Sequence, residues 1–132
     1  MKIAEVSERY GISSDTLRYY ERIGLIPPVN RNDHGIRDYC EIDVRRVEFI
    51  KCMRSAGLPI EALIEYVGLV QQGDGTIEAR KDILKEQRGQ LAARMKEMQK
   101  TLDILDHKIK VYENAVLQKE KEIVQIKEPE II

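Results

Sequence analysis

Tryptophan is absent from this sequence of 132 residues, and phenylalanine occurs only once. With so few large aromatic rings, the core must be modest and built mainly from aliphatic side chains. The length suits one domain, or a small domain with an appendage. No apolar run approaches the length that crosses a membrane, and the first residues lack a secretion signal. We therefore expect a cytoplasmic protein that has no membrane partner.

Cysteine is also scarce, since Cys40 and Cys52 are the only two in the sequence. Their spacing fits no common metal-binding motif, and we expect free thiols in a reducing cytoplasm. The two histidines, His34 and His107, have no nearby partner that would complete a catalytic pair. A glycine-rich phosphate-binding loop is missing as well. The sequence therefore predicts no enzyme, no metal site and no cofactor.

The chain lacks the excess of positive charge that marks many nucleic-acid-binding proteins. It carries 22 Lys and Arg against 23 Asp and Glu, for a formal net charge of -1. Residues 1–58 hold ten basic and nine acidic side chains, which is barely positive. Any affinity for phosphate must therefore come from the local placement of a few side chains.

What the chain does contain is a long segment with a regular apolar pattern. From Thr76 to about Lys121 there is no proline and a single glycine, which predicts one long helix with Thr76 as its N-cap. Two series of apolar residues each recur every seven positions: Leu84, Leu91, Met98, Leu105 and Tyr112, and Met95, Leu102, Ile109, Val116 and Ile123. This is the seam of a coiled coil. Pairing with a second copy, parallel or antiparallel, is favoured; packing on its own head is the alternative.

The first 72 residues predict a set of short helices separated by turns. A first helix presents Ile3, Val6 and Tyr10 on one face, and Gly11 to Ser13 forms a turn whose serine can cap the second helix. In that second helix Leu17 and Tyr20 should face the core. This pattern fits a helix-turn-helix.

Beyond the second helix, Pro27 and Pro28 end the helical pattern, and Val29 to Tyr39 predicts a hairpin that turns at residues 32–35. A third helix is expected from about Glu41 to Ala56. Its apolar stripe should hold Ile42, Phe49, Met53 and Ala56. A fourth helix is expected over residues 59–71, with Pro59 in its first turn.

Three runs identify a family: Thr16-Leu17-Arg18-Tyr19-Tyr20-Glu21, Gly24-Leu25-Ile26-Pro27 and Arg37-Asp38-Tyr39. Together they resemble the winged-helix DNA-binding domain of the MerR family of transcriptional regulators. The resemblance implies a mostly α fold, a winged helix-turn-helix head with a long C-terminal coiled-coil dimerisation helix. The head should cover residues 1–72 and the dimerisation helix residues 76–121. Residues 122–132 are expected to be a disordered tail.

The resemblance also implies how the protein works. Family dimers bind a near-palindromic promoter operator and distort it, so that RNA polymerase can engage both promoter elements. The expected DNA-binding residues lie on the second helix and the wing: Ser14, Thr16, Arg18, Tyr19, Arg37 and Tyr39. Plain packing remains the alternative for Tyr19 and Tyr39. For Arg22, Arg31 and Lys51, a solvated role and a phosphate contact are equally open.

The signal that such a regulator would sense is suggested by one thiol. The segment around Cys52 resembles a branch of the family that has a single cysteine in the third helix and responds to aldehyde or electrophile stress. The alternative for Cys52 is a small buried side chain. Cys40 is a second choice, because the N–H groups of a helix N-terminus favour thiolate. Two other functions stay open: a regulator that senses a small non-covalent ligand between the head and the dimer helix, and a coiled-coil adaptor.

Overall fold

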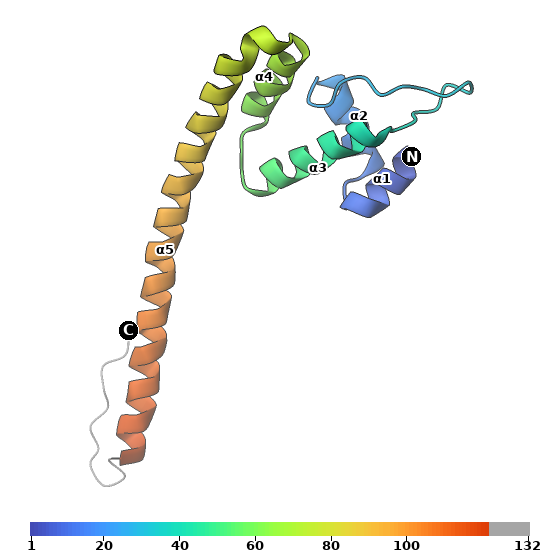
Figure 1. Cartoon of the computed structure of the whole chain (residues 1–132). Helices are drawn as coiled ribbons and strands as arrows, with labels where there is room; N and C mark the ends of the chain where they lie inside the picture. The colour runs from blue at the N-terminus through green and yellow to red at the C-terminus, as the bar shows by residue number, and fades with distance from the viewer. Residues whose placement is uncertain (122–132) are drawn as a thin grey trace. The chain divides into compact units, whose positions relative to one another are not determined.

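A computed structural model describes residues 1–121, and almost all of its regular structure is helical (Figure 1). The helices are α1 (Ile3–Tyr10), α2 (Ser14–Arg22), α3 (Glu41–Ser55), α4 (Ile60–Gln71), the short 3-10 helix η1 (Asp74–Thr76) and α5 (Ile77–Lys121). The prediction of a mostly α fold with a long C-terminal helix is confirmed. The expected tail at 122–132 lies outside the described residues.

The first two helices and their turn form as the sequence predicts. Gly11 adopts the left-handed conformation, with φ of 66°, and its N–H donates to the Ser7 carbonyl at 2.9 Å. Glycine reaches this conformation without the steric cost that a Cβ atom brings. The Ser13 hydroxyl then caps α2 by accepting from the Thr16 N–H at 3.1 Å.

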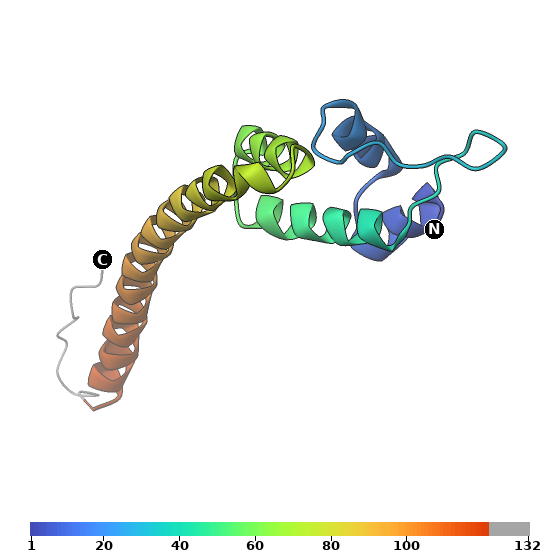
Figure 2. The same cartoon turned by 45° about the horizontal axis from the view of Figure 1, so that its top comes forward.

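The connection between α2 and α3 is a loop that projects away from the neighbouring helices (Figures 1 and 2). Residues 1–121 contain no regular strand, and the expected two-stranded hairpin is reduced here to one antiparallel bridge between Arg31 and Arg37. The Asn32 side chain closes the turn by accepting from the backbone N–H groups of His34 and Ile36. We call residues 29–39 the wing. Two backbone hydrogen bonds cross it, from the Asn32 N–H to the Ile36 carbonyl at 2.8 Å and from the Asp38 N–H to the Asn30 carbonyl at 2.7 Å.

Two apolar clusters hold the head together. The first joins α1, α2, the wing and α3 through Val6, Leu17, Ile26, Val29, Tyr39 and Val47. The second joins α3 and α4 through Leu25, Ile50, Leu58 and Leu63. Tyr20 packs against both clusters, as its predicted core position requires.

The buried face of α3 differs from the predicted stripe. Asp43, Val47 and Ile50 are its buried residues, whereas Ile42 is 57% exposed. Phe49 and Met53 are only partly buried against the second cluster. The prediction for Ile42 is wrong because α3 packs against two clusters, through Val47 in the first and Ile50 in the second. Ile42 belongs to neither cluster.

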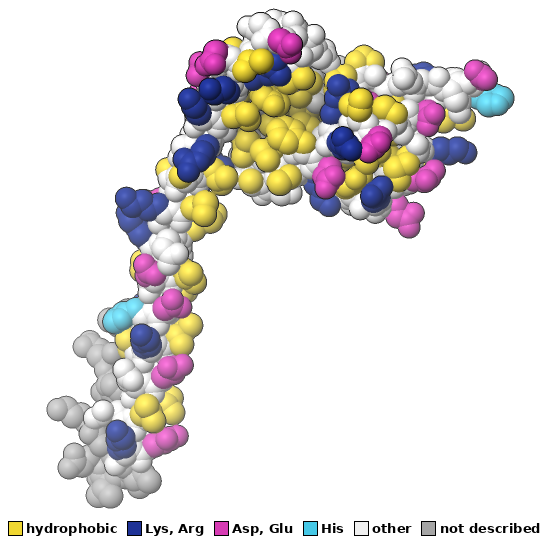
Figure 3. Space-filling view, in the orientation of Figure 1, with side chains coloured by type: hydrophobic (Ala, Val, Ile, Leu, Met, Phe, Trp, Pro, Cys, Tyr) yellow, Lys and Arg dark blue, Asp and Glu magenta, His cyan; other side chains and the backbone are white. Residues whose placement is uncertain are grey.

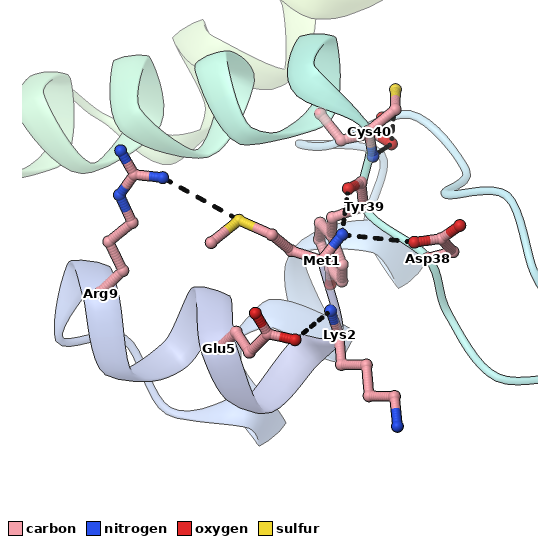
Figure 4. A network of polar contacts seen from close by, with 8 residues as sticks. Met1, Lys2, Glu5, Arg9, Asp38, Tyr39 and Cys40 are labelled. Carbon is pink, nitrogen blue, oxygen red and sulfur yellow. Dashed lines mark hydrogen bonds and ion pairs between the residues drawn. The ribbon is translucent and has the colours of Figure 1, made fainter.

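The base of the wing is tied to the first residue of the chain (Figure 4). The Met1 nitrogen donates to the Tyr39 carbonyl at 2.7 Å and lies 3.3 Å from Asp38 Oδ1. In return, the Tyr39 N–H donates to the Met1 carbonyl at 2.7 Å. These bonds fix the wing where it enters α3.

Residue contacts divide the chain into two units after Leu91, so the first turns of α5 belong to the same unit as the head. In the second unit, which begins at Ala92, the predicted seam side chains are open to solvent: Met95, Met98, Leu102, Leu105, Ile109, Tyr112 and Val116 are each at least half exposed. Ile123, the last seam residue, lies outside the described residues. No helix between Met1 and Lys121 is long and apolar enough to cross a membrane.

Candidate nucleic-acid interface

The outer face of α2 carries the basic and aromatic side chains that the sequence singled out. Arg18 is exposed, and its guanidinium pairs with the Asp15 carboxylate at 2.9 Å. Asp15 is almost fully in solvent, so this ion pair is weak and can be exchanged for a phosphate at little cost. Arg18 is therefore available for a DNA contact.

Tyr19 is 41% exposed and lies beside two other side chains. The Arg22 guanidinium carbon is 5.4 Å from the centre of the Tyr19 ring, and the Tyr20 ring is 6.3 Å away. A cation over an aromatic face holds both groups in place. This contact joins Arg22 to the exposed face of α2.

Ser14 and Thr16 lie in the first turn of α2 and are half-buried. The Thr16 hydroxyl accepts from the Ser13 hydroxyl at 2.8 Å, so it belongs to the capping group of the helix. Its own O–H can donate to an oxygen acceptor that approaches the N-terminus of α2. Thr16 is thus placed for a phosphate contact, close to Arg18.

Arg37 links the wing to α2. Its Nε donates to Glu21 Oε1 at 2.9 Å, and the two side chains are only 19% and 15% exposed. Because a guanidinium has five N–H donors, this bond leaves others for a phosphate. The ion pair therefore holds the wing against α2, and only the Nε–H donor of Arg37 is used in it.

Tyr39 lies in the first core cluster and is 2% exposed, so the packing alternative describes its place in the structure. A DNA contact by its side chain does not fit that position, because Val29 and Val47 belong to the same cluster. Its buried hydroxyl has no hydrogen-bond partner within residues 1–121. Burial, and then the Glu21 carboxylate, raise the pKa of Tyr39 above its ordinary value of 10.0.

The electrostatics of Tyr39 also show which residues meet at this point. Arg37 and Arg18 both act on the Tyr39 hydroxyl and lower its pKa, opposing the Glu21 and Asp43 carboxylates. The ion pair between Glu21 of α2 and Arg37 of the wing, at 2.9 Å, joins the same two elements directly. The structure therefore brings α2 and the base of the wing together.

The two cysteines differ in their surroundings, although both are exposed. Cys40 precedes α3, and its thiol donates to Asp43 Oδ2 at 3.2 Å (Figure 4). Cys52 lies in α3, and its exposure contradicts the alternative of a small buried side chain. Within residues 1–121, no group of three His, Cys, Asp or Glu could hold a metal ion.

An apolar groove of about 310 Å³ lies between α3 and α4. Figure 3 shows hydrophobic side chains gathered over these two helices. Phe49 and Tyr66 meet across the groove with ring centres 5.8 Å apart, and Arg45 and Arg46 line it as well. The groove is large enough for a small apolar molecule.

Sequence reasoning missed the link between Glu21 and Arg37. Glu21 belongs to the same run as Arg18 and Tyr19, but nothing in the local pattern shows that its carboxylate reaches a residue sixteen positions away. Its burial beside the core was the missing information. A carboxylate on the inner side of an amphipathic helix is the signal that could have indicated a buried partner.

Comparisons with known proteins agree with this geometry. A family model described as "MerR HTH family regulatory protein" matches residues 1–68, and one described as "MerR, DNA binding" matches residues 44–108. The HTH-type transcriptional regulator AdhR of Bacillus subtilis (strain 168) is 62% identical over 91 residues, which are 69% of this chain and 65% of AdhR. The aligned part is thus just under two thirds of that relative.

Solved structures agree as well. A MerR family transcriptional regulator from Listeria monocytogenes matches with a TM-score of 0.88 and 48% identity, over 93% of each chain. HiNmlR, a MerR family regulator lacking the sensor domain and bound to promoter DNA, matches with a TM-score of 0.78 and 28% identity. That match covers 88% of this chain and 92% of HiNmlR. With its helix-turn-helix, wing and long helix in place, this chain belongs to the MerR family of helix-turn-helix regulatory proteins.

Proposed function

We propose that the protein is a cytoplasmic, homodimeric transcriptional regulator that binds a near-palindromic promoter operator and distorts it to activate transcription. The observation that carries this proposal is the exposed face of α2 with Arg18 and Tyr19 on it, in a helix that Glu21 ties to Arg37 of the wing at 2.9 Å. One helix for a groove and one loop for the flanking backbone make a winged helix-turn-helix interface. Enzymatic activity has no part in this proposal.

The dimer is supported by the exposed seam of α5. In a single chain, Leu102, Leu105 and Ile109 are each 50% exposed or more. An unpaired α5 would therefore leave these apolar side chains in water. Exposed apolar stripes of this kind mark protein interfaces. Pairing two copies through this seam would bury the stripe and place two α2 helices on one duplex.

Distortion of the duplex limits how such a regulator can be controlled. Bending or untwisting a promoter costs several kcal/mol, roughly 1–6 by elastic arguments. A signal must therefore favour the distorting state of the dimer by a comparable free energy. Covalent attachment of an effector to the head could supply a bias of this kind.

Arg18→Met tests the DNA interface. We expect the affinity for the operator to fall about 5- to 150-fold, as when a contact of about 1–3 kcal/mol is lost. The salt dependence of binding should also become shallower, by about one unit of slope if Arg18 contacts a phosphate. Binding is measured by fluorescence anisotropy at several salt concentrations.

Arg45→Met is the matched control, because Arg45 forms a similar exposed ion pair with Glu41 at 2.7 Å, on α3. It should bind the operator as the unaltered protein does. Equal binding by the Arg18 and Arg45 variants, with the same salt slope, would remove α2 from the interface.

We further propose that Cys52 senses aldehydes or other thiol-reactive compounds. The support is its exposure, together with the resemblance to the single-cysteine branch of the family. In the reaction, the sulfur attacks the carbonyl carbon, a C–S bond forms, and the carbonyl oxygen takes up the thiol proton. The product is a hemithioacetal, and no oxidant is needed. The added group would change the packing around α3, which contacts both core clusters.

Cys52→Ser and Cys40→Ser form a matched pair that tests this step. We expect aldehyde induction of a reporter promoter to be lost in the Cys52 variant and kept in the Cys40 variant. Mass spectrometry of the treated protein should locate the adduct on Cys52. Full induction in the Cys52 variant would rule out the covalent mechanism.

The groove between α3 and α4 favours a second candidate, in which a small non-covalent ligand is sensed. Its lining is mainly apolar, and Arg45 and Arg46 favour a neutral or anionic ligand over a cationic one. Val67→Phe would fill part of this groove. Under this alternative, Val67→Phe abolishes induction and Cys52→Ser does not, which is the reverse of the covalent mechanism.

A further inference from the structure

A network of hydrogen bonds joins the end of α4 to the start of α5. The Thr76 hydroxyl lies 2.7 Å from the Leu69 carbonyl oxygen and 2.8 Å from the Gly73 carbonyl oxygen. Arg80 donates from Nε to the Thr76 hydroxyl at 3.0 Å and from Nη2 to the Gly73 carbonyl at 3.0 Å. All four contacts are partly buried. We call this group the α4–α5 clamp.

The clamp takes Thr76 away from the role predicted for it. The helix begins at Ile77, one residue after Thr76, as an N-cap would require. The Thr76 hydroxyl, however, contacts the Leu69 and Gly73 carbonyls behind it, and from α5 it accepts a bond from the Arg80 side chain. Thr76 therefore fastens the new helix to the preceding one.

The position of Arg80 points to the same purpose. A cation in the first turn of α5 meets the positive end of that helix, which is electrostatically unfavourable. The Arg80 side chain reaches the Gly73 carbonyl just past the C-terminus of α4, where carbonyl oxygens lack helical partners and attract cations. Gly73, with φ of 93°, supplies the reversal that makes this contact possible.

On its α4 side, the clamp adjoins a helix that packs against the core. Leu63 is 2% exposed in the second core cluster, and Ile64 and Val67 pack against that cluster. Tyr20 of α2 contacts the same cluster. A continuous set of packed residues therefore runs from α2 through the core to α4, and the clamp extends it into the first turns of α5.

We infer that Arg80 and Thr76 are positioning residues that fix the direction in which α5 leaves the head, and so the separation of the two α2 helices in a dimer. This inference rests on the proposed function, because the separation matters only if two heads read one duplex. Successive half-sites must match the geometry of the dimer, so a fixed exit direction becomes a preference for one operator spacing.

The test is a series of operators whose half-sites are moved apart or together by one to four base pairs. The full chain should bind one spacing best and lose affinity on either side of it. Arg80→Met removes both donors while keeping a long apolar side chain. We expect it to lower affinity for the best spacing at least tenfold and to flatten the dependence on spacing. Affinity for a single half-site should change less than twofold.

Matched variants separate positioning from a loss of stability. Arg88→Met makes the same change at an exposed position of α5 and should keep the full preference. Arg80→Lys, which has one nitrogen for two acceptors, should restore part of the preference. Thr76→Val should behave like Arg80→Met, and Thr76→Ser like the unaltered chain.

Hydrogen exchange gives a second readout that needs no DNA. In Arg80→Met, the Gln72, Gly73 and Thr76 amides, which donate to carbonyls around the clamp, should exchange at least tenfold faster. Amides of α2 should not change. Unchanged exchange, or a spacing preference in Arg80→Met equal to that of the unaltered chain, overturns the inference. Failure of the unaltered chain to bind any duplex would instead overturn the proposed function and leave the exchange measurement to decide the clamp.

Discussion

The head and the outer part of α5 treat their apolar side chains in opposite ways. In the head, Leu17, Leu25 and Val47 are fully buried between short helices. Beyond Ala92, the side chains of the seam stand in water; Met98, for example, is 68% exposed. Figure 3 shows these hydrophobic side chains alternating with charged ones along α5. The head buries its apolar side chains within a single chain, whereas the outer part of α5 leaves them exposed in the single chain.

This difference follows from geometry. Short helices joined by tight turns can surround a common centre, so each covers the apolar face of another. A single straight helix cannot fold back on its own stripe. The head therefore depends on local packing for its stability, whereas the stability of the proposed dimer through the second unit should depend on protein concentration. Four sets of substitutions test this difference between the two regions, in order of decreasing expected effect.

The largest effect is expected from charge placed in the seam. Leu102→Lys with Leu105→Lys should convert the proposed dimer to a monomer. The dimer would lose four leucines that its seam buries, at about 1.5–3 kcal/mol each. The dissociation constant should rise by several orders of magnitude, as measured by analytical ultracentrifugation. Ile104→Lys is the control, since Ile104 is 60% exposed but lies outside both series. A double variant that stays dimeric would contradict the seam.

A cavity in the head should have a smaller but clear effect. Leu17→Ala removes a fully buried side chain and should lower the free energy of unfolding by about 2–5 kcal/mol. Urea denaturation at one fixed protein concentration measures the change. Ile36→Ala, at a site 46% exposed on the wing, should stay within about 0.5 kcal/mol of the unaltered protein. Equal losses of unfolding free energy in the two variants would show that Leu17 and Ile36 are buried to the same extent.

The ion pair between the wing and α2 should matter more than an exposed one. Glu21→Gln leaves the charge of Arg37 half-buried without its partner and should cost about 1–2 kcal/mol of stability. Glu41→Gln breaks the exposed pair with Arg45 and should cost less than about 0.5 kcal/mol. Thermal denaturation of both variants provides the comparison. A larger loss for Glu41→Gln would show that burial does not strengthen the first pair.

The smallest effect is expected at the unpartnered hydroxyl of the core. Tyr39→Phe removes a buried O–H that makes no hydrogen bond, so stability near pH 7 should stay equal or rise by less than about 1 kcal/mol. Because burial raises the pKa of Tyr39, the unfolded chain releases this proton more readily than the folded one.

The stability that Tyr39 contributes is therefore complete below its ordinary pKa of 10.0 and is lost as the pH rises above it. The advantage of Tyr39→Phe should grow above about pH 10, which urea denaturation at several pH values would detect. A constant difference between the two proteins from pH 8 to pH 11 would show that the hydroxyl titrates alike in both states.

Much of the head was predictable because its signals are local. The Gly11 turn and the Ser13 cap depend on residues within a few positions of each other, and both form as expected. The wing was predicted less well: hairpin pairing needs partners on both flanks, and the structure holds only one bridge. Ile42 was misplaced for a related reason, since the direction of burial around α3 depends on which elements pack against it.

From the sequence alone we could predict the helices, the seven-residue seam of α5 and the outer face of α2 with its arginines. The reason is that helical periodicity depends on residues three or four positions apart. The tertiary structure was needed to show that Tyr39 is buried and that Glu21 pairs with Arg37. It was also needed to show that Arg80 donates to the Gly73 carbonyl between α4 and α5. These contacts join different elements of the fold. Their formation depends on burial and on angles between elements, which no local pattern of residues specifies.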